Sequence, residues 1–206
     1  RLRDITKQAP YRKRLAEEAL DQLGPFDHAF YTDGSFVPST RFSAGACYAF
    51  SCDQSPRKRQ AHDTTFCQAA CVTGLAAASY TPELRSLVLP PAMMHKDPVK
   101  YNQKRIFIGT DSQSCLTAMN PLKKPKFGKL DPTAPLKAYL DAAREHDSTM
   151  YLQWIPSHTD LPGNTEADEI ANAQRFHSSF QDQLQCQIAP ASLKTFLRQH
   201  ETRAFH

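Results

Sequence analysis

The sequence lacks the features that mark membrane and secreted proteins. It contains no run of about 18 apolar residues, so we expect no membrane-spanning helix and no membrane partner. It opens with no charged segment followed by an apolar one, so we expect no signal peptide. The first residue is Arg1 rather than Met, as in a fragment of a longer protein. Glycine is scarce, with seven residues against 15 prolines, which favours stiff connections over flexible linkers.

The six cysteines form no Cys-x-x-Cys pair, and no histidine pair has zinc-finger spacing. A structural zinc site of that kind is therefore not expected. Without a signal peptide, free thiols in a reducing compartment are favoured over a disulfide framework. We expect an intracellular protein of the nucleus or cytoplasm, with an organelle left open.

The 206 residues are 40% hydrophobic and 22% charged, as in a globular protein with one main domain. The formal net charge is +4, but it is distributed unevenly. Residues 96–130 contain eight basic and two acidic side chains, an excess larger than that of the whole chain. Lys123, Lys124, Lys126 and Lys129 are the most closely spaced, and they fit either a solvated surface or a contact with a polyanion.

The pattern of apolar and turn residues predicts a mixed α/β sheet. Strands are expected at 28–33, 42–50, 58–63, 105–111 and 150–155. Helices are expected at 11–23, 64–80, 112–119, 134–146, 164–176 and 192–200, with Asn164 as the cap of the helix that it begins. Residues 82–104 contain four prolines and are predicted to be an inserted loop. Trp154 alternates with its neighbours in a strand and is expected in the core.

Three aspartates occupy similar places in this pattern. Asp33 and Asp111 each end a predicted strand, and Asp168 lies in the first turn of a predicted helix. Strand ends that face one edge of an α/β sheet are where ligands converge. Carboxylates gathered there repel one another unless a cation is present, and all-oxygen ligands favour Mg²⁺ or Mn²⁺. Each aspartate alone also fits a turn former or a residue that complements a helix dipole.

Three motifs carry a resemblance to a known family: Tyr31-Thr-Asp-Gly-Ser35, Gly109-Thr-Asp-Ser-Gln-Ser114, and the segment from Trp154 to Asp168. Together they resemble the ribonuclease H (RNase H) family, particularly the domains attached to reverse transcriptases of retroelements. The resemblance implies an RNase H-like α/β fold, a five-stranded mixed sheet whose first three strands are antiparallel, flanked by helices. It also implies three regions: a basic helical extension at 1–26, the RNase H-like domain at 27–177 and a C-terminal extension at 178–206.

The resemblance further implies hydrolysis of the RNA strand of RNA–DNA hybrids with two Mg²⁺ ions, which Mn²⁺ can replace. In the family, an Asp-Glu-Asp-Asp set holds the metal. Asp33, Asp111 and Asp168 match the first, third and fourth members of this set. His158 matches the mobile-loop histidine that assists proton transfer or product release.

The second carboxylate has no match in the predicted pattern. The family places this Glu early in the first long helix, and that position in the predicted helix 64–80 is Ala70. Asp63 precedes the predicted helix and Glu83 follows its end, so neither is assigned. Three explanations stay open: engineered inactivation, natural decay, and a misalignment by one helical turn. A catalytically inactive module that serves in nucleic-acid binding or protein assembly is therefore the alternative function.

The resemblance also implies contacts with a nucleic-acid duplex. Lys123, Lys124 and Lys126 are candidates for the phosphate backbone, and Ser35, Ser112 and Asn164 are candidates for polar contacts. The expected partners are an RNA–DNA hybrid and other domains of a larger polyprotein. A different Asp-dependent phosphotransfer enzyme of doubly wound fold is a weaker reading, because it leaves the antiparallel opening unexplained.

Overall fold

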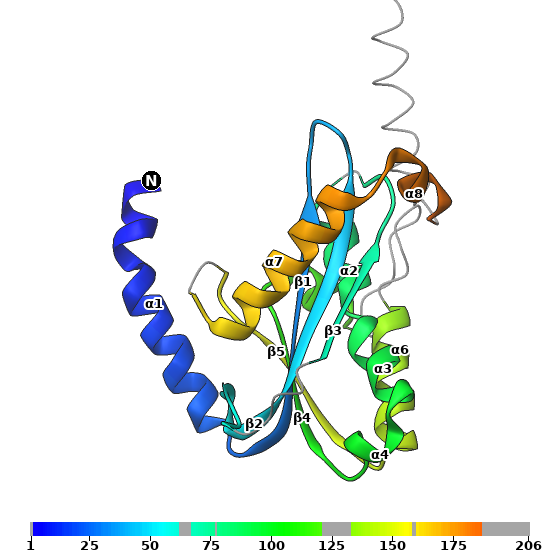
Figure 1. Cartoon of the computed structure of the whole chain (residues 1–206). Helices are drawn as coiled ribbons and strands as arrows, with labels where there is room; N and C mark the ends of the chain where they lie inside the picture. The colour runs from blue at the N-terminus through cyan, green and yellow to red at the C-terminus, as the bar shows by residue number, and fades with distance from the viewer. Residues whose placement is uncertain (1, 62–66, 77, 121–132, 158–159, 187–206) are drawn as a thin grey trace, which may run out of the picture.

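The computed structural model describes residues 2–61, 67–76, 78–120, 133–157 and 160–186 (Figure 1). Five strands form one mixed sheet in the order β3-β2-β1-β4-β5. They are β1 (Phe26–Phe36), β2 (Ser43–Arg59), β3 (Cys67–Val72), β4 (Arg105–Thr110) and β5 (Thr149–Trp154). Strands β1 to β3 are antiparallel, whereas β4 pairs in parallel with β1 and β5 with β4. The predicted fold class is confirmed.

Eight helices accompany this sheet in the described part of the chain. They are α1 (Leu2–Gln22), α2 (Tyr80–Ser86), α3 (Leu89–Lys96), α4 (Pro98–Tyr101), α5 (Gln113–Ala118), α6 (Thr133–Glu145), α7 (Pro162–His177) and α8 (Phe180–Gln185). None of them is both long enough and apolar enough to cross a membrane. The predicted helix at 192–200 lies outside the described residues.

The region between β2 and β4 differs most from the prediction. Strand β2 continues to Arg59, through the residues between the second and third predicted strands and into the first two residues of the predicted strand 58–63. The third strand of the structure, β3, lies inside the predicted helix 64–80. The predicted loop at 82–104 is wrong, because α2, α3 and α4 occupy it. Its prolines lie in the first turns of these helices, where a missing N–H removes no intrahelical hydrogen bond.

The sheet is covered on both faces, and alternate residues of its central strands pack on opposite sides. Phe30 and Ile108 pack with Leu87 and Met94, which belong to the α2–α3 segment, in a core that α6 also closes. Tyr31 and its neighbours on the other face pack against α1 and α7. Figure 1 shows α1 and α7 on one side of the sheet and α2, α3 and α6 on the other.

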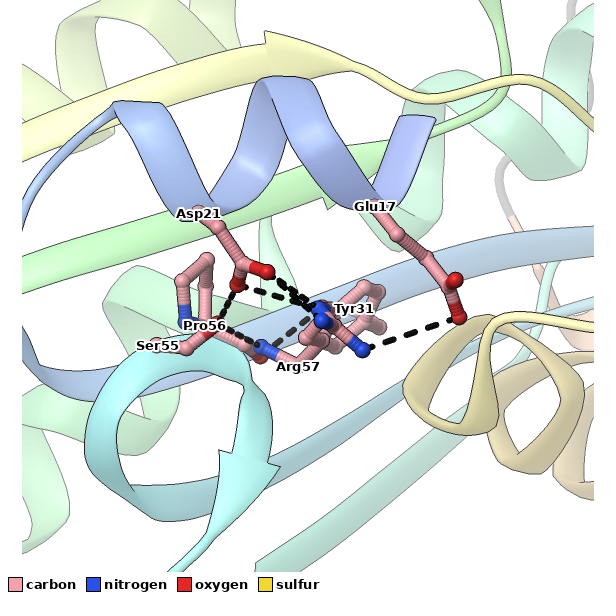
Figure 2. Close-up of polar contacts among 6 residues, drawn as sticks. All are labelled: Glu17, Asp21, Tyr31, Ser55, Pro56 and Arg57. Carbon is pink, nitrogen blue, oxygen red and sulfur yellow. Dashed lines mark hydrogen bonds and ion pairs between the residues drawn. The ribbon is translucent and has the colours of Figure 1, made fainter. Parts of the chain in front are cut away.

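Helix α1 is joined to the far end of β2 by a polar cluster (Figure 2). The Arg57 guanidinium donates to both carboxylate oxygens of Asp21, with Nη2 at 2.6 Å from Oδ2. It also lies 3.7 Å from a carboxylate oxygen of Glu17. The Ser55 hydroxyl donates to Asp21, and the buried Tyr31 hydroxyl donates to the Pro56 carbonyl at 2.8 Å. The extended end of β2 therefore supports α1 from the side of the sheet.

Candidate active site

Two parallel strands bring the first two aspartates together. Thr32 of β1 pairs with Thr110 of β4, so Asp33 and Asp111 follow the same step of the ladder. Strand β4 ends at Thr110, which leaves Asp111 at the edge where β1 continues alone beside β2. The Trp154 indole Nε1 donates to the Asp111 carbonyl at 3.0 Å and holds this turn in place. Trp154 is 39% exposed, so its predicted place in the core is wrong.

Glu83 is the third carboxylate at this edge. One carboxylate oxygen from each of Asp33, Glu83 and Asp111 lies within 4.8 Å of the other two. Glu83 reaches the cluster because the start of α2 packs directly on β1 at Gly34. A Cβ built on Gly34 would lie 2.6 Å from the Pro82 carbonyl carbon and closer still to the Glu83 backbone nitrogen. Only a glycine at position 34 permits this approach.

Asp168 approaches the cluster from the opposite side, on α7. It forms a side-chain hydrogen bond with Asp33 and contributes to the electrostatic field at both Asp33 and Glu83. Asn172 Nδ2 donates to Asp168 Oδ1 at 2.9 Å, and the Ser35 hydroxyl donates to Asn172 Oδ1 at 2.7 Å. A polar chain therefore connects α7 to β1 next to the carboxylates. Because α7 begins at Pro162, Asp168 lies in its second turn rather than its first.

The carboxylates disfavour one another's ionised form. Burial raises the pKa of Asp33, and the charge of Asp111 raises it further, although the Gly34 N–H donates to Asp33 Oδ1 at 2.7 Å. Burial also raises the pKa of Glu83, with Asp33 and Asp111 as the next causes. Glu83 Oε2 is buried and has no hydrogen-bond partner among the described residues. Crowded carboxylates with an unpaired buried oxygen are the surroundings that a hard divalent cation neutralises, so the residues fit Mg²⁺ or Mn²⁺.

Ala70 does not lie in a helix. It is an exposed residue of β3 that pairs with Ala46, and Ala46 pairs in turn with Asp33. Ala70 is therefore two strands away from Asp33, roughly 10 Å at the usual strand spacing. The predicted helix that placed Ala70 at the position of the family's Glu is wrong, because these residues form β3. Glu83 is the carboxylate beside Asp33 and Asp111.

A local signal for Glu83 was present in the sequence. Pro82 and Glu83 follow Ser79, and both Pro and Glu are favoured in the first turn of a helix. The prolines of residues 82–104 favour a loop there, whereas Pro82 lies in the first turn of α2. The same residue type marks either end of a helix, and only its neighbours distinguish the two cases.

The predicted nucleic-acid residues are only partly described. Ser35 is buried, and its hydroxyl donates to Asn172. Ser112 directly precedes α5, and its hydroxyl lies 3.2 Å from that of Ser114. Asn164 is in the first turn of α7 instead of capping it, and its Oδ1 is buried without a partner among the described residues. His158, Lys123, Lys124, Lys126 and Lys129 lie outside the described residues.

Comparisons with known proteins agree with this architecture. The family model described as RNase H matches residues 26–176. None of the curated proteins matches the chain. The solved structures similar to the chain include the N-terminal RNase H domain of Rv2228c from Mycobacterium tuberculosis, a fusion with maltose-binding protein. That structure has a TM-score of 0.52 and 17% identity over 73% of this chain and 94% of its own.

Two further solved structures show the same likeness. RNase H1 from the halophilic archaeon Halobacterium salinarum has a TM-score of 0.52 and 15% identity, over 73% of this chain and 98% of its own. LC9-RNase H1, described as a type 1 RNase H with the type 2 active-site motif, has a TM-score of 0.53 and 17% identity. The match covers 74% of this chain and 73% of that one. At these identities the likeness supports the fold.

Proposed function

Because the chain belongs to the RNase H family, we propose that it hydrolyses the RNA strand of RNA–DNA hybrids with Mg²⁺ or Mn²⁺. The observation that carries the proposal is the position of Glu83. With it, Asp33, Glu83, Asp111 and Asp168 supply a complete Asp-Glu-Asp-Asp set. The set favours an active nuclease over a domain inactivated at Ala70.

Asp33, Glu83, Asp111 and Asp168 are the residues that would hold two divalent cations. Bound cations supply activation of the attacking water and stabilisation of the leaving oxygen in a phosphodiester displacement. Each carboxylate is held by its own element: Asp33 by the central strand, Asp111 by the turn after β4, Glu83 by α2 and Asp168 by α7. Rigid elements preserve the spacing that in-line attack requires.

Gly34 and Asn172 orient two of these carboxylates. The Gly34 N–H donates to Asp33 Oδ1, and Asn172 Nδ2 donates to Asp168 Oδ1, so a hydrogen bond fixes one oxygen of each carboxylate in place. We assign His158 to proton transfer or product release, as the motif predicts. We assign the phosphate backbone to Lys123, Lys124 and Lys126, and polar contacts with the hybrid to Ser35, Ser112 and Asn164. The retroelement origin and the larger polyprotein stay predictions from the motifs.

A cleavage assay on a labelled RNA–DNA hybrid with Mg²⁺ distinguishes Glu83 from Ala70 as the position that controls activity. We expect the unmodified chain to cleave the RNA strand. Glu83→Gln removes a metal ligand at nearly constant size, so it should lower the rate by about 100-fold or more, a loss of about 2.7 kcal/mol. Ala70→Glu is the matched control and should leave the rate unchanged.

The opposite result would support Ala70, rather than Glu83, as the position of the second carboxylate. An inactive unmodified chain that gains cleavage with Ala70→Glu would identify position 70 as the missing ligand. A third result would favour a catalytically inactive binding module. In that case both the unmodified chain and Ala70→Glu bind the hybrid, and neither cleaves it with Mg²⁺ or with Mn²⁺.

A further inference from the structure

A second group of metal-ligating side chains lies between α3 and the end of α6. His95 is in the last turn of α3, Glu145 is the last residue of α6, and His146 follows it. One ligand atom from each of the three lies within 4.8 Å of the other two. None of these residues belongs to the carboxylate cluster, so what they bind does not depend on the proposed nuclease activity.

His146 is buried, and one of its two ring nitrogens has no polar partner in the described part of the chain. The residue is only 1% exposed, and its Nε2 has no hydrogen-bond partner among the described residues. Its backbone is held firmly, since its N–H donates to the Ala142 carbonyl and its carbonyl accepts from the Gln103 N–H at 2.8 Å. A buried imidazole nitrogen without a partner loses the hydrogen bond that it would make in water. A bound ligand would restore that interaction.

His95 and Glu145 lie next to His146. His95 Nδ1 is 2.9 Å from Glu145 Oε2, and the rings of His95 and His146 have centroids 5.7 Å apart. The side chains of His95 and Glu145 are 43% and 55% exposed, so the group opens to solvent on one side. An ion pair at such exposure contributes little to stability and makes no use of His146.

Two imidazoles and one carboxylate are a ligand set that zinc prefers, whereas Mg²⁺ prefers oxygen ligands alone. We propose that His95, Glu145 and His146 form a binding site for a divalent transition metal of the zinc type. Three protein ligands leave a fourth coordination position open toward solvent. Because the ligands come from α3 and from the end of α6, the bound metal would link these two segments. It would stabilise the folded chain by an amount that grows with the logarithm of the free metal concentration once this exceeds the dissociation constant.

Binding is tested with Zn²⁺ alone, by calorimetric titration and by the Zn²⁺-dependent shift in melting temperature. Asp33→Asn serves as the background in which the carboxylate cluster is weakened as a competing site. We expect Zn²⁺ to bind and raise the melting temperature in both the unmodified chain and the Asp33→Asn chain. Co²⁺ in place of Zn²⁺ should give the visible absorption of a site with nitrogen ligands.

His95→Ala and Glu145→Gln should each lower the Zn²⁺ affinity by at least about tenfold in the Asp33→Asn background. Both side chains are partly exposed, so the variants should fold, which circular dichroism checks; His146 is left intact because it is buried. His177→Ala removes an exposed histidine at the end of α7 and should leave binding unchanged. Unchanged affinity in His95→Ala and Glu145→Gln, or the absence of Zn²⁺ binding in Asp33→Asn, would overturn the proposal.

Discussion

At the scale of single residues, Gly34 controls whether Glu83 can reach Asp33. The start of α2 lies so close to β1 that a methyl group on residue 34 has no space. Gly45, on the neighbouring strand, faces the same helix less tightly: its Cβ would lie 3.0 Å from the Pro82 carbonyl oxygen and from the Ser86 nitrogen. The two glycines therefore set the distance between α2 and the sheet.

Gly34→Ala should push α2 away from β1 and separate Glu83 from Asp33. We expect the hydrolysis rate to fall by at least about tenfold, with a loss of stability of about 1–3 kcal/mol from overpacking. Gly45→Ala is the matched control. It should lower the hydrolysis rate and the stability less than Gly34→Ala does, because α2 lies farther from residue 45. Rates on a labelled hybrid and urea unfolding measure the two effects. Equal activity of Gly34→Ala and the unmodified chain would show that the close approach is not needed.

At the scale of elements, α1 is attached to the sheet by a cluster of charges beside its apolar contacts. Arg57 holds two carboxylates of α1, and the pKa of Asp21 falls to about 2, chiefly through its hydrogen bond with Arg57. Ala16 and Leu20 pack on the same face of the sheet. Charge and burial thus act on the same helix, and only the contribution from charge depends on salt.

Arg57→Ala should lower the free energy of unfolding by about 1 kcal/mol or less, because the pair is partly exposed. The pKa of Asp21 is lowered on folding, so its contribution is present above about pH 4 and lost as the pH falls toward 2. Urea unfolding at low and high salt measures the difference, which should shrink at high salt. Arg59→Ala removes an exposed arginine of the same strand and is the control. An equal loss in both variants would contradict the role of Arg57.

At the scale of the whole molecule, the carboxylate cluster links stability to pH and to metal. Folding raises the pKa of Asp33 to about 8, whereas an unfolded aspartate ionises near pH 4. Between these values the unfolded chain binds fewer protons than the folded chain, so the stability of the metal-free protein falls as the pH rises. Glu83 acts in the same direction. A bound cation replaces the proton and removes this cost.

We expect the metal-free chain to lose more than about 1 kcal/mol of unfolding free energy between pH 5 and pH 8. Saturating Mg²⁺ should abolish most of that fall, and Asp33→Asn should reduce it without metal. Urea unfolding with a chelator and with Mg²⁺ measures the slope, and Asp53→Asn, an exposed aspartate of β2, should leave it unchanged. A metal-free stability that rises over this range would refute the assignment.

Local patterns in the sequence determined the fold class and the place of Asp111, because an apolar strand that is followed directly by aspartate is readable without knowledge of the rest. The predicted strand end at Asp33 is wrong, because pairing with β2 continues β1 to Phe36. Only the tertiary structure decided where the third strand lies and that Glu83 is the second carboxylate of the cluster. The Ala-rich residues of β3 have no strong strand propensity, and pairing with β2 overrides that preference. Glu83 joins Asp33 and Asp111 only through the packing of α2 on Gly34. Such a contact joins segments about 50 residues apart, so no local pattern could have specified it.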